Sequence, residues 1–252
     1  MKTKIFLFGI SGKMGKSVLE CSFSHKNLEV VGGFDFVQSL TLPTFSHIKN
    51  VNINFDAIID FSRPDTLDSV IALAEKTMKP VVIATTGFSD EQKKKIEVLS
   101  KKVPVFLSSN MSVGVNVLLK LVSEASKYLC SISDIEIIEK HHNQKVDAPS
   151  GTARMILDSI ESSCSPPPCY GRVGHDALRQ DNEIGVHAIR GGTIVGEHAV
   201  LFCMNDEVVS IKHEALSRKI FANGALKAAD FLTEKKAGLY NMNDLIEVKN
   251  KQ

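Results

Sequence analysis

In the first half of the chain, short apolar runs alternate with stretches in which apolar residues recur every three or four positions. The apolar runs have the length of β-strands and lie at residues 4–10, 28–35, 56–62, 79–87 and 103–109. Helical spacing fills the gaps between them, at residues 13–25, 64–74 and 89–101. Because strands that alternate with helices form parallel sheets covered on both faces, this half predicts an α/β domain built on a parallel sheet.

The pattern changes after about residue 112, where strands begin to follow one another without helices between them. The elements predicted here are helices at 113–129 and 150–162, and strands at 134–142, 183–190, 193–203 and 207–215. The sequence Arg190-Gly191-Gly192-Thr193 fits a hairpin turn between two of the strands, because glycine accepts positive φ. These features predict a second, α+β domain with an open mixed or antiparallel sheet.

A last helix is predicted from Ser217 to about Glu234, with apolar residues gathered on one face. We expect this helix to return to the first domain and pack on it. The predicted organisation is therefore a discontinuous first domain of residues 1–112 and 217–252 and a second domain of residues 113–216.

Composition excludes several classes of function. The 252 residues contain 30 Lys and Arg against 29 Asp and Glu, a net charge of +1, with 3 Tyr and no Trp. Without a basic block or stacking aromatics, a nucleic-acid partner is not expected. The apolar runs are too short to span a membrane, and the N-terminus enters a strand without a signal-peptide pattern, so a cytoplasmic location is predicted.

The five cysteines are Cys21, Cys130, Cys164, Cys169 and Cys203. They form no C-x-x-C pair, and their number is odd. Reduced thiols are therefore expected, and the closeness of Cys164 and Cys169 in the sequence is interpreted as a coincidence within a loop.

The sequence GISGKMG, residues 9–15, directly follows the first predicted strand. Gly12 and Gly15 match the second and third glycines of the dinucleotide fingerprint G-x-G-x-x-G, whereas Ile10 occupies the first position. Asp35 ends the second strand, where a carboxylate accepts hydrogen bonds from the adenine-side ribose. Together these features favour a Rossmann-like nucleotide domain, and a purely structural glycine turn is the alternative.

The residues near Asp35 bear on the choice of cofactor. Phe36 follows the acid, so no adjacent cation is present to bind the 2′-phosphate of NADPH. Lys13 and Lys16 remain possible sources of such a cation. NADH is therefore favoured, with NADPH tolerated.

The sequence EKHHNQKVDAPSGTA, residues 139–153, contains the chemistry of a second site. His141 and His142 end a predicted strand, Lys145 follows in the turn, and Ser150 or Thr152 can cap the next helix. A cation, two imidazoles and a helix N-terminus suit a carboxylate ligand, plausibly a dicarboxylate. Histidine titrates near neutral pH and is the natural proton donor.

Plainer interpretations of this cluster remain open. Adjacent histidines on a strand point to opposite faces, so one of them can be a buried structural residue. A third ligand at metal-site spacing is missing, and no metal is predicted. A capped helix also needs Ser or Thr whether or not a ligand binds.

The run EKHHNQKVDAPSGTA closely resembles the signature of the 4-hydroxy-tetrahydrodipicolinate reductase (dihydrodipicolinate reductase) family, whose members act in lysine and diaminopimelate biosynthesis. The resemblance spans nearly the whole chain. It includes, in the family's order, GISGKMG, IDFSRP, TTGF, NMSVGVNV, IRGGTIVGEH and SRKIFANGAL.

The resemblance implies an NAD(P)H-dependent reductase with a dinucleotide-binding first domain and a second domain for substrate binding and oligomerisation, often a homotetramer. It implies that His141 is the proton donor, that Lys145 is the second catalytic group, and that the substrate contacts are His142, Ser150, Gly151 and Thr152. The cofactor contacts that it implies are Gly9, Ile10, Ser11, Gly12, Lys13, Met14, Asp35, Ala84, Thr85, Thr86, Ser108, Ser109, Asn110 and Met111.

Two positions depart from the family pattern, since Ala84 often corresponds to glycine and Met111 to phenylalanine. Two other functions are alternatives to the reductase. An NAD-linked semialdehyde dehydrogenase needs a cysteine nucleophile, and none of the five cysteines lies in the cluster. A regulatory protein that only senses dinucleotides would keep the glycine loop but would not need His141 together with Lys145.

Overall fold

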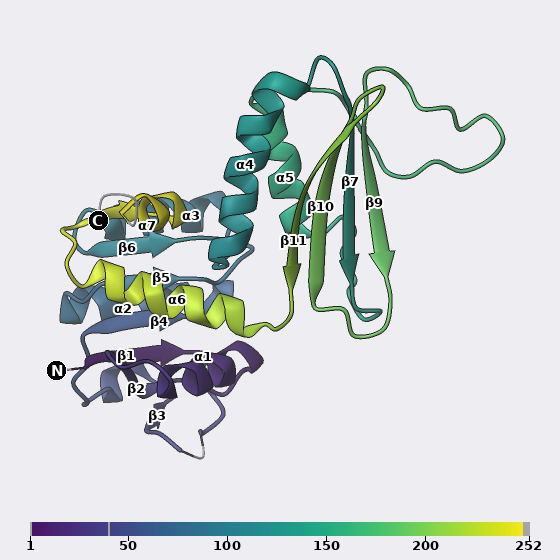
Figure 1. Ribbon diagram of the computed structural model, residues 1–252. Helices are drawn as coiled ribbons and strands as arrows, with labels where there is room; N and C mark the ends of the chain where they lie inside the picture. The colour runs from purple at the N-terminus through teal and green to yellow at the C-terminus, as the bar shows by residue number, and fades with distance from the viewer. Residues whose placement is uncertain (1, 40, 249–252) are drawn as a thin grey trace. The chain divides into compact units, whose positions relative to one another are not determined.

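Seven strands form a parallel sheet in the computed structural model, which describes residues 2–39 and 41–248 (Figure 1). Their bounds are β1 Thr3–Phe8, β2 Leu28–Phe34, β3 Thr44–Phe45, β4 Ala57–Asp60, β5 Val81–Ile83, β6 Pro104–Leu107 and β12 Gly238–Tyr240. The order across the sheet is β12-β6-β5-β4-β1-β2-β3, and every pairing is parallel. The predicted parallel sheet is confirmed; β3 and β12 are short edge strands that the hydrophobic pattern did not indicate.

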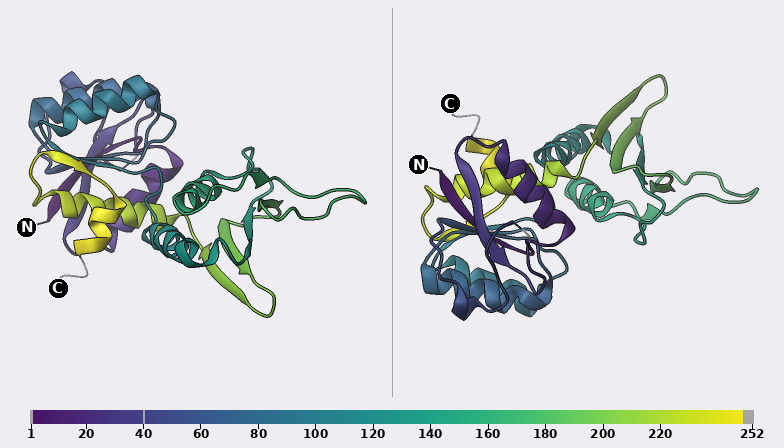
Figure 2. Two further views of the ribbon diagram at one scale, coloured as in Figure 1. Left: turned by 90° about the horizontal axis from the view of Figure 1, so that it is seen from above. Right: turned by 90° about the horizontal axis from the view of Figure 1, so that it is seen from below.

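Helices cover both faces of this sheet (Figure 2). They are α1 Lys13–Phe23, α2 Leu67–Thr77, α3 Asp90–Ser100, α6 Lys219–Leu232 and α7 Met242–Val248, with short 3-10 helices η1 Ile48–Asn50 and η2 Pro64–Thr66. Alternate residues of β1 supply the two cores: Ile5 and Leu7 pack with α1 and α6, whereas Phe6 and Phe8 pack with α2 and α3. Residues 5–8 of this strand are all apolar because both faces of the strand are buried there.

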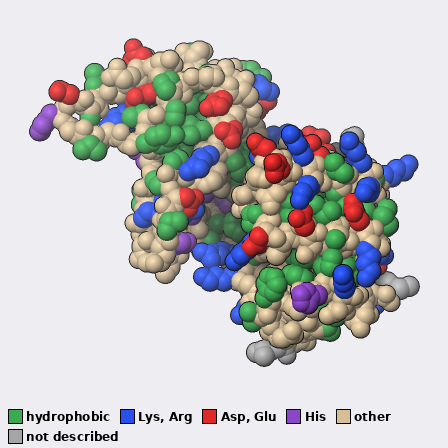
Figure 3. Space-filling model, turned by 180° about the vertical axis from the view of Figure 1, so that it is seen from behind, with side chains coloured by type: hydrophobic (Ala, Val, Ile, Leu, Met, Phe, Trp, Pro, Cys, Tyr) green, Lys and Arg blue, Asp and Glu red, His purple; other side chains and the backbone are tan. Residues whose placement is uncertain are grey.

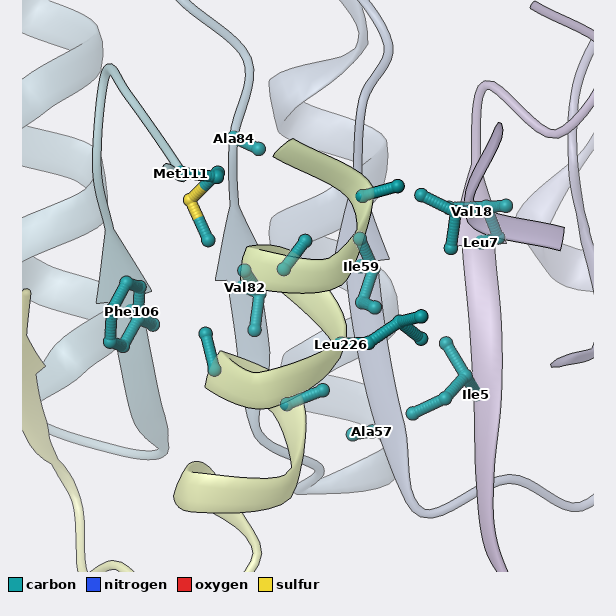
Figure 4. Close-up of a cluster of buried hydrophobic side chains, with 14 of the residues drawn as sticks. Ile5, Leu7, Val18, Ala57, Ile59, Val82, Ala84, Phe106, Met111 and Leu226 are labelled. Atoms are coloured by element: carbon teal, nitrogen blue, oxygen red, sulfur yellow. The ribbon is translucent and has the colours of Figure 1, made fainter. Parts of the chain in front are cut away.

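Helix α6 brings the C-terminal part of the chain back to the first sheet, as the amphipathic pattern predicts. Its alanines and Leu226 pack over Ile59, Val82 and Phe106, all of which are fully buried (Figure 4). The unit formed by this packing comprises residues 1–113 and 218–252.

The second unit, residues 114–217, is a mixed sheet with two helices packed on one face. The helices are α4 Val113–Leu129 and α5 Gly151–Glu161, and the strands are β7 Asp134–His141, β8 Pro168–Cys169, β9 Ile184–Arg190, β10 Gly196–Cys203 and β11 Val208–Ala215. The order is β11-β10-β7-β9-β8. Strand β10 is antiparallel to β7 and β11, whereas β7, β8 and β9 run parallel, so the predicted mixed sheet is confirmed. The segment between α5 and β9 projects from this unit (Figure 2).

The predicted hairpin at residues 190–193 is wrong. Strands β9 and β10 do not pair with each other, because β7 lies between them. The two glycines instead carry the chain across the end of β7, where Gly191 N donates to His141 O (2.9 Å) and Asn143 N donates to Gly192 O (3.2 Å). Gly192 has a φ of +47°, a conformation that glycine adopts without strain.

The expectation that all cysteines are reduced is also wrong, because Cys130 and Cys164 form a disulfide. Cys130 directly follows α4, and Cys164 lies just beyond α5. The C-terminal ends of these two helices converge and bring the Cα atoms to 6.3 Å, within the range that a disulfide bridges. The sequence separation of 34 between the two cysteines hid this pairing in the sequence.

Within residues 2–39 and 41–248, the helices lack the combination of length and apolar character needed to cross a membrane. Lys and Arg side chains are interspersed with Asp and Glu on the face drawn in Figure 3. A cytoplasmic location stays a prediction from the sequence.

Gly224 of α6 provides the first test of this packing. A Cβ at Gly224 would lie 1.7 Å from the carbonyl oxygen of Met111, so the helix approaches that backbone only because glycine has no side chain. We expect Gly224→Ala to lower the free energy of unfolding by about 1–3 kcal/mol through overpacking, although alanine is the better helix former.

Urea denaturation followed by circular dichroism measures this change. Gly151→Ala, at the first residue of α5, is the control because a Cβ there meets no atom within 4 Å. Equal stability of Gly224→Ala and the unmodified protein would contradict the close approach.

Candidate functional site

The glycine loop turns the chain tightly between β1 and α1. Gly9 has a φ of +78°, and a Cβ at Gly15 would lie 2.1 Å from the Gly9 carbonyl oxygen. Only glycine at these positions lets the start of α1 pack so closely on the turn. Gly12 is the N-cap and offers no side-chain acceptor to the first turn of the helix. The loop therefore has the shape and the exposed helix start that suit a pyrophosphate.

Asp35 holds the glycine loop against the end of β2. Its Oδ2 accepts a hydrogen bond from Ser11 N (3.0 Å), and its Oδ1 accepts one from Val37 N (3.3 Å). The Ser11 hydroxyl donates in turn to Val37 O (2.6 Å). Each carboxylate oxygen has a lone pair left, so Asp35 can still accept from ribose hydroxyls.

Asp35 and the glycine loop share a cavity of about 280 Å³. Its lining residues are Gly9, Gly12, Phe34, Asp35, Phe36, Phe61, Ser62, Arg63 and Thr66. Arg63, which is not among the predicted cofactor residues, adds an exposed guanidinium paired with Asp65.

The segment 61–63 of this cavity is fixed by a buried acid at the end of β4. Asp60 is 1% exposed, and its Oδ1 accepts from Ser62 N at 2.9 Å. Burial raises the pKa of Asp60, whereas hydrogen bonds from Ser62 oppose this change.

Some predicted cofactor residues contribute only backbone to the surface. The side chains of Ile10, Ala84 and Met111 are buried in the core beneath α6; Figure 4 shows the latter two. Ala84 follows β5, and Met111 lies in the loop after β6, so both loops leave the carboxyl ends of neighbouring strands. Ligands of open parallel sheets bind at this edge.

Of the remaining predicted cofactor residues, Lys13 and Met14 begin α1, and the others lie in the loops after β5 and β6. Thr85 is buried and Thr86 is exposed. In the second loop Ser108 Oγ donates to Asn110 O (2.8 Å), and Ser112 N donates to Asn110 Oδ1 (2.9 Å). Hydrogen bonds within the loop therefore fix its conformation.

In the second unit, β7 presents His141 and Glu139 on the face covered by α4 and α5. Alternation along the strand places both with Ile135 and Ile137 of the core. His141 Nδ1 lies 2.6 Å from Glu139 Oε2, and His141 is 9% exposed. This bond leaves Nε2 of His141 for a ligand.

Helix α5 begins beside this pair. Ser150 is its N-cap, with Oγ accepting from Ala153 N (3.1 Å) and N donating to Glu139 Oε1 (3.0 Å). A Cβ at Gly151 would meet no atom within 4 Å, so the space beside the helix start is open. The N–H groups of an open helix start suit a carboxylate.

A turn after β7 brings Lys145 back towards the same place. Lys145 N donates to His142 O (3.2 Å), and Lys145 Nζ pairs with Asp147 at 2.7 Å. Arg190 links this loop to the His141 pair, because its Nη2 donates to both Asp147 O and Glu139 Oε1. His141, Lys145, Ser150 and the helix start are thus neighbours in the structure.

His198 is a buried partner that the sequence did not reveal. It is 4% exposed, its Nε2 lies 2.9 Å from Ser150 Oγ, and its ring meets that of His141 edge-on at 5.1 Å. Burial, together with the nearby charge of His141, lowers the pKa of His198 to about 4. His198 is therefore neutral at pH 7.

Arg190 and Glu139 were also absent from the predicted site. Arg190 binds both oxygens of Glu139, each at 2.7 Å. Strand alternation could have indicated Glu139, since it lies two residues before His141. Arg190 and His198 lie in the family motif IRGGTIVGEH, but that motif does not place them beside His141; the register of β9 and β10 against β7 does.

Models of known families match both halves of the chain. "Dihydrodipicolinate reductase, N-terminus" matches residues 3–111, and "Dihydrodipicolinate reductase, C-terminus" matches residues 114–246. The chain belongs to the dihydrodipicolinate reductase family. The resemblance expected from the sequence motifs is thereby confirmed.

Two relatives that carry the family's enzyme name match this chain over nearly their full length. The chain is 47% identical over 252 residues to the 4-hydroxy-tetrahydrodipicolinate reductase of Clostridium novyi, covering 98% of this chain and all of the relative. It is 48% identical over 250 residues to the enzyme of that name from Caldanaerobacter subterraneus, covering 98% of this chain and 99% of the relative.

Among solved structures, the chain is similar to a dipicolinate-bound dihydrodipicolinate reductase from Paenisporosarcina sp. TG-14. The TM-score is 0.79 at 25% identity, and the match covers 96% of this chain and 98% of that one. Within residues 2–39 and 41–248 of the present chain, no group of three or more His, Cys, Asp or Glu is arranged to hold a metal ion.

The buried histidine predicts how stability depends on pH. The ordinary pKa of histidine is 6.5, and that of folded His198 is about 4, so between these values the unfolded chain binds a proton that the folded chain does not. Acidification through this window should therefore lower the free energy of unfolding by up to about 3 kcal/mol. Burial also lowers the pKa of His141 and His213, which adds to the loss.

Urea denaturation at about pH 7 and about pH 4.5 measures this dependence. His198→Gln, which keeps a polar group near the Nε2 position, should lose less stability on acidification. His175→Gln is the control because His175 is exposed. An unchanged acid sensitivity in His198→Gln would show that His198 is not the responsible group.

Proposed function

We propose that the chain catalyses the NAD(P)H-dependent reduction of 4-hydroxy-tetrahydrodipicolinate to tetrahydrodipicolinate with loss of water, a step of diaminopimelate and lysine biosynthesis. The observation that carries this proposal is the grouping of His141, Lys145 and the open start of α5. The family and the name of its relatives support the same reaction.

The substrate is a ring with two carboxylates, and the second unit offers matching groups. The N–H groups at Gly151 and Thr152 are proposed to bind one carboxylate at the helix start, where Ser150 fixes the first turn. His142 and Lys145 supply further polar contacts. Dipicolinate, a ring dicarboxylate, is the ligand named for the similar structure from Paenisporosarcina.

The nicotinamide nucleotide supplies a hydride when it is bound. Loss of the 4-hydroxyl group as water leaves a conjugated imine, hydride adds at C4, and a proton must then reach the carbanionic C3. Protonated His141 is proposed to donate this proton from Nε2, and Lys145 offsets negative charge that develops on the ring. Proton donation and charge stabilisation by positioned groups each lower the barrier by several kcal/mol.

The first unit is proposed to bind the nucleotide. Gly9, Gly12 and Gly15 form the close turn for the pyrophosphate, and Asp35 accepts from the adenine-side ribose. NADH is proposed to be favoured, because the Asp35 carboxylate repels a 2′-phosphate. Arg63 lines the same cavity and can offset that repulsion, but Asp65 already engages its charge.

The second unit is also proposed to form a homotetramer through its sheet. The sheet face opposite α4 and α5 carries apolar residues that the single chain leaves partly exposed, among them Ile138, Ile189 and Leu201. Contact between subunits would remove this apolar surface from water.

A semialdehyde dehydrogenase remains the less favoured enzyme. Its cysteine nucleophile must form a thiolate, whereas burial raises the pKa of the Cys21 and Cys203 thiols. Cys130 and Cys164 are joined in a disulfide.

Substitution of the two proposed catalytic groups tests the function. His141→Gln should lower kcat about 100-fold or more with little change in KM, because only the proton donor is lost. Lys145→Ala should impair both kcat and KM, because Lys145 contacts the substrate and its developing charge. The assay follows NADH absorbance with freshly generated substrate.

Lys127→Ala is the control, since Lys127 forms an exposed pair with Glu124 on α4. Its activity should equal that of the unmodified protein. Near-normal turnover in both site variants would refute the assignment.

Cofactor preference tests the role of Asp35. The unmodified protein should show a higher kcat/KM with NADH than with NADPH. Asp35→Asn removes the charge that repels the 2′-phosphate, so the ratio of kcat/KM for NADPH to that for NADH should rise about tenfold. A preference of the unmodified protein for NADPH above about tenfold would overturn the proposed preference.

A further inference from the structure

The proposed chemistry leaves one buried carboxylate of the second unit without a role. Glu139 is 0% exposed and lies on β7 two residues before His141, on the same face of the strand. Its Oε2 lies 2.6 Å from His141 Nδ1. A fully buried acid is rare unless it is paired, so its partners need an explanation.

Arg190 compensates this charge with two hydrogen bonds. Its Nη1 donates to Glu139 Oε2 and its Nη2 donates to Glu139 Oε1, both at 2.7 Å. Arg190 is in register with His141 across β7 and β9. Nη2 also donates to Asp147 O (2.7 Å), and Asp147 pairs with Lys145. The arginine therefore connects the carboxylate to the loop that carries the second catalytic group.

The same carboxylate also holds the start of α5. Glu139 Oε1 accepts from Ser150 N at 3.0 Å, so a single side chain binds the imidazole of His141, the guanidinium of Arg190 and the N-cap of the helix.

We propose that Glu139, clamped by Arg190, is the positioning residue that holds His141 with Nε2 directed to the substrate and stabilises its protonated form. This inference rests on the proposed function. Glu139 does not touch the substrate itself; it acts through His141, much as an acid behind a catalytic histidine fixes the tautomer and orientation of the ring.

The surroundings of Nε2 support this orientation. A Cβ at Gly196 would lie 3.1 Å from His141 Nε2 and 3.3 Å from Cδ2, so a residue without a side chain leaves space beside this edge of the ring. With Nδ1 bound to Glu139, Nε2 is the nitrogen that faces this space.

The ionisation of Glu139 is consistent with its contacts to Arg190 and His141. Burial alone would raise the pKa of Glu139, but hydrogen bonds from Arg190 and His141 bring it below its ordinary value. Glu139 is therefore ionised at neutral pH and can stabilise an imidazolium. Removal of Arg190 would leave this charge buried without its main partner, which is costly.

Each neighbour changes the pKa of His141 in a known direction. Burial lowers it most, Glu139 of β7 raises it, and Lys145 of the following loop and Arg190 of β9 lower it. The other titratable groups close to this site are His198 of β10, whose pKa of about 4 keeps it neutral, and Asp147 of the loop, which pairs with Lys145.

Two variants test the proposal because they should move the pKa of His141 in opposite directions. Glu139→Gln should lower it, so the alkaline limb of kcat/KM moves to lower pH and kcat falls about 100-fold with KM changed less. Arg190→Met should move the alkaline limb to higher pH. NMR titration of the His141 ring, assigned by comparison with His141→Gln, measures the same pKa without turnover.

Glu136→Gln is the matched control. Glu136 lies on β7 but on the opposite face, where it also binds an arginine, Arg172, and a histidine, His187. Its loss should leave the titration of His141 unchanged even if the Tm falls. Measured Tm values and the Kd for NADH identify any variant that merely unfolds, and the NMR titration is then read on Arg190→Lys and Glu139→Asp instead.

The outcomes separate this inference from the proposed function. A lower pKa of His141 in Glu139→Gln together with a higher one in Arg190→Met supports the inference. If the pKa of His141 does not move in opposite directions in these two variants, or if it changes similarly in Glu136→Gln, the inference is overturned. If the unmodified protein does not oxidise NADH with the substrate, the proposed function fails. The NMR titration, repeated with dipicolinate as ligand, then still decides whether Glu139 controls His141.

Discussion

A carboxylate buried in a protein interior must be compensated, and this requirement organises the second unit. Glu139 has no exposed surface, so its two oxygens must be satisfied by groups that the fold supplies. Those groups come from β7, β9 and the start of α5, through His141, Arg190 and Ser150. Satisfying one acid therefore fixes three elements at the place proposed for the substrate carboxylate and the proton donor.

The first unit depends on a different constraint, the close approach of backbones in a parallel sheet. Strand β1 is buried on both faces, and the chain leaving it must turn at once into α1. Gly9 and Gly15 permit that turn, and the loops after β5 and β6 leave the same edge of the sheet. The site is thus made mostly of backbone, which explains why Ile10, Ala84 and Met111 can bury their side chains in the core.

Local patterns allowed most of the fold and part of the site to be predicted from the sequence. Strands and helices followed from periodicity, and the grouping of His141, Lys145 and Ser150 followed from a short strand-turn-helix segment. Partners that depend on strand order carried no such signal. Because β7 lies between β9 and β10, the predicted hairpin does not form, and Arg190 and His198 lie beside His141. The converging ends of α4 and α5 allow the disulfide that the sequence did not indicate.

Strand β7 shows why residue types alone do not define a site. Its two faces carry similar sets: Glu139 with His141 and Arg190, and Glu136 with His187 and Arg172. The first set is hydrogen-bonded to the start of α5, beside open space at Gly151. On this face burial lowers the pKa of His141 most, and Glu139 opposes that change. On the other face the same residue types hold the segment before β9 against the sheet. The hydrogen bond to the start of α5, which residue types alone do not encode, separates the face of the proposed proton donor from the other face.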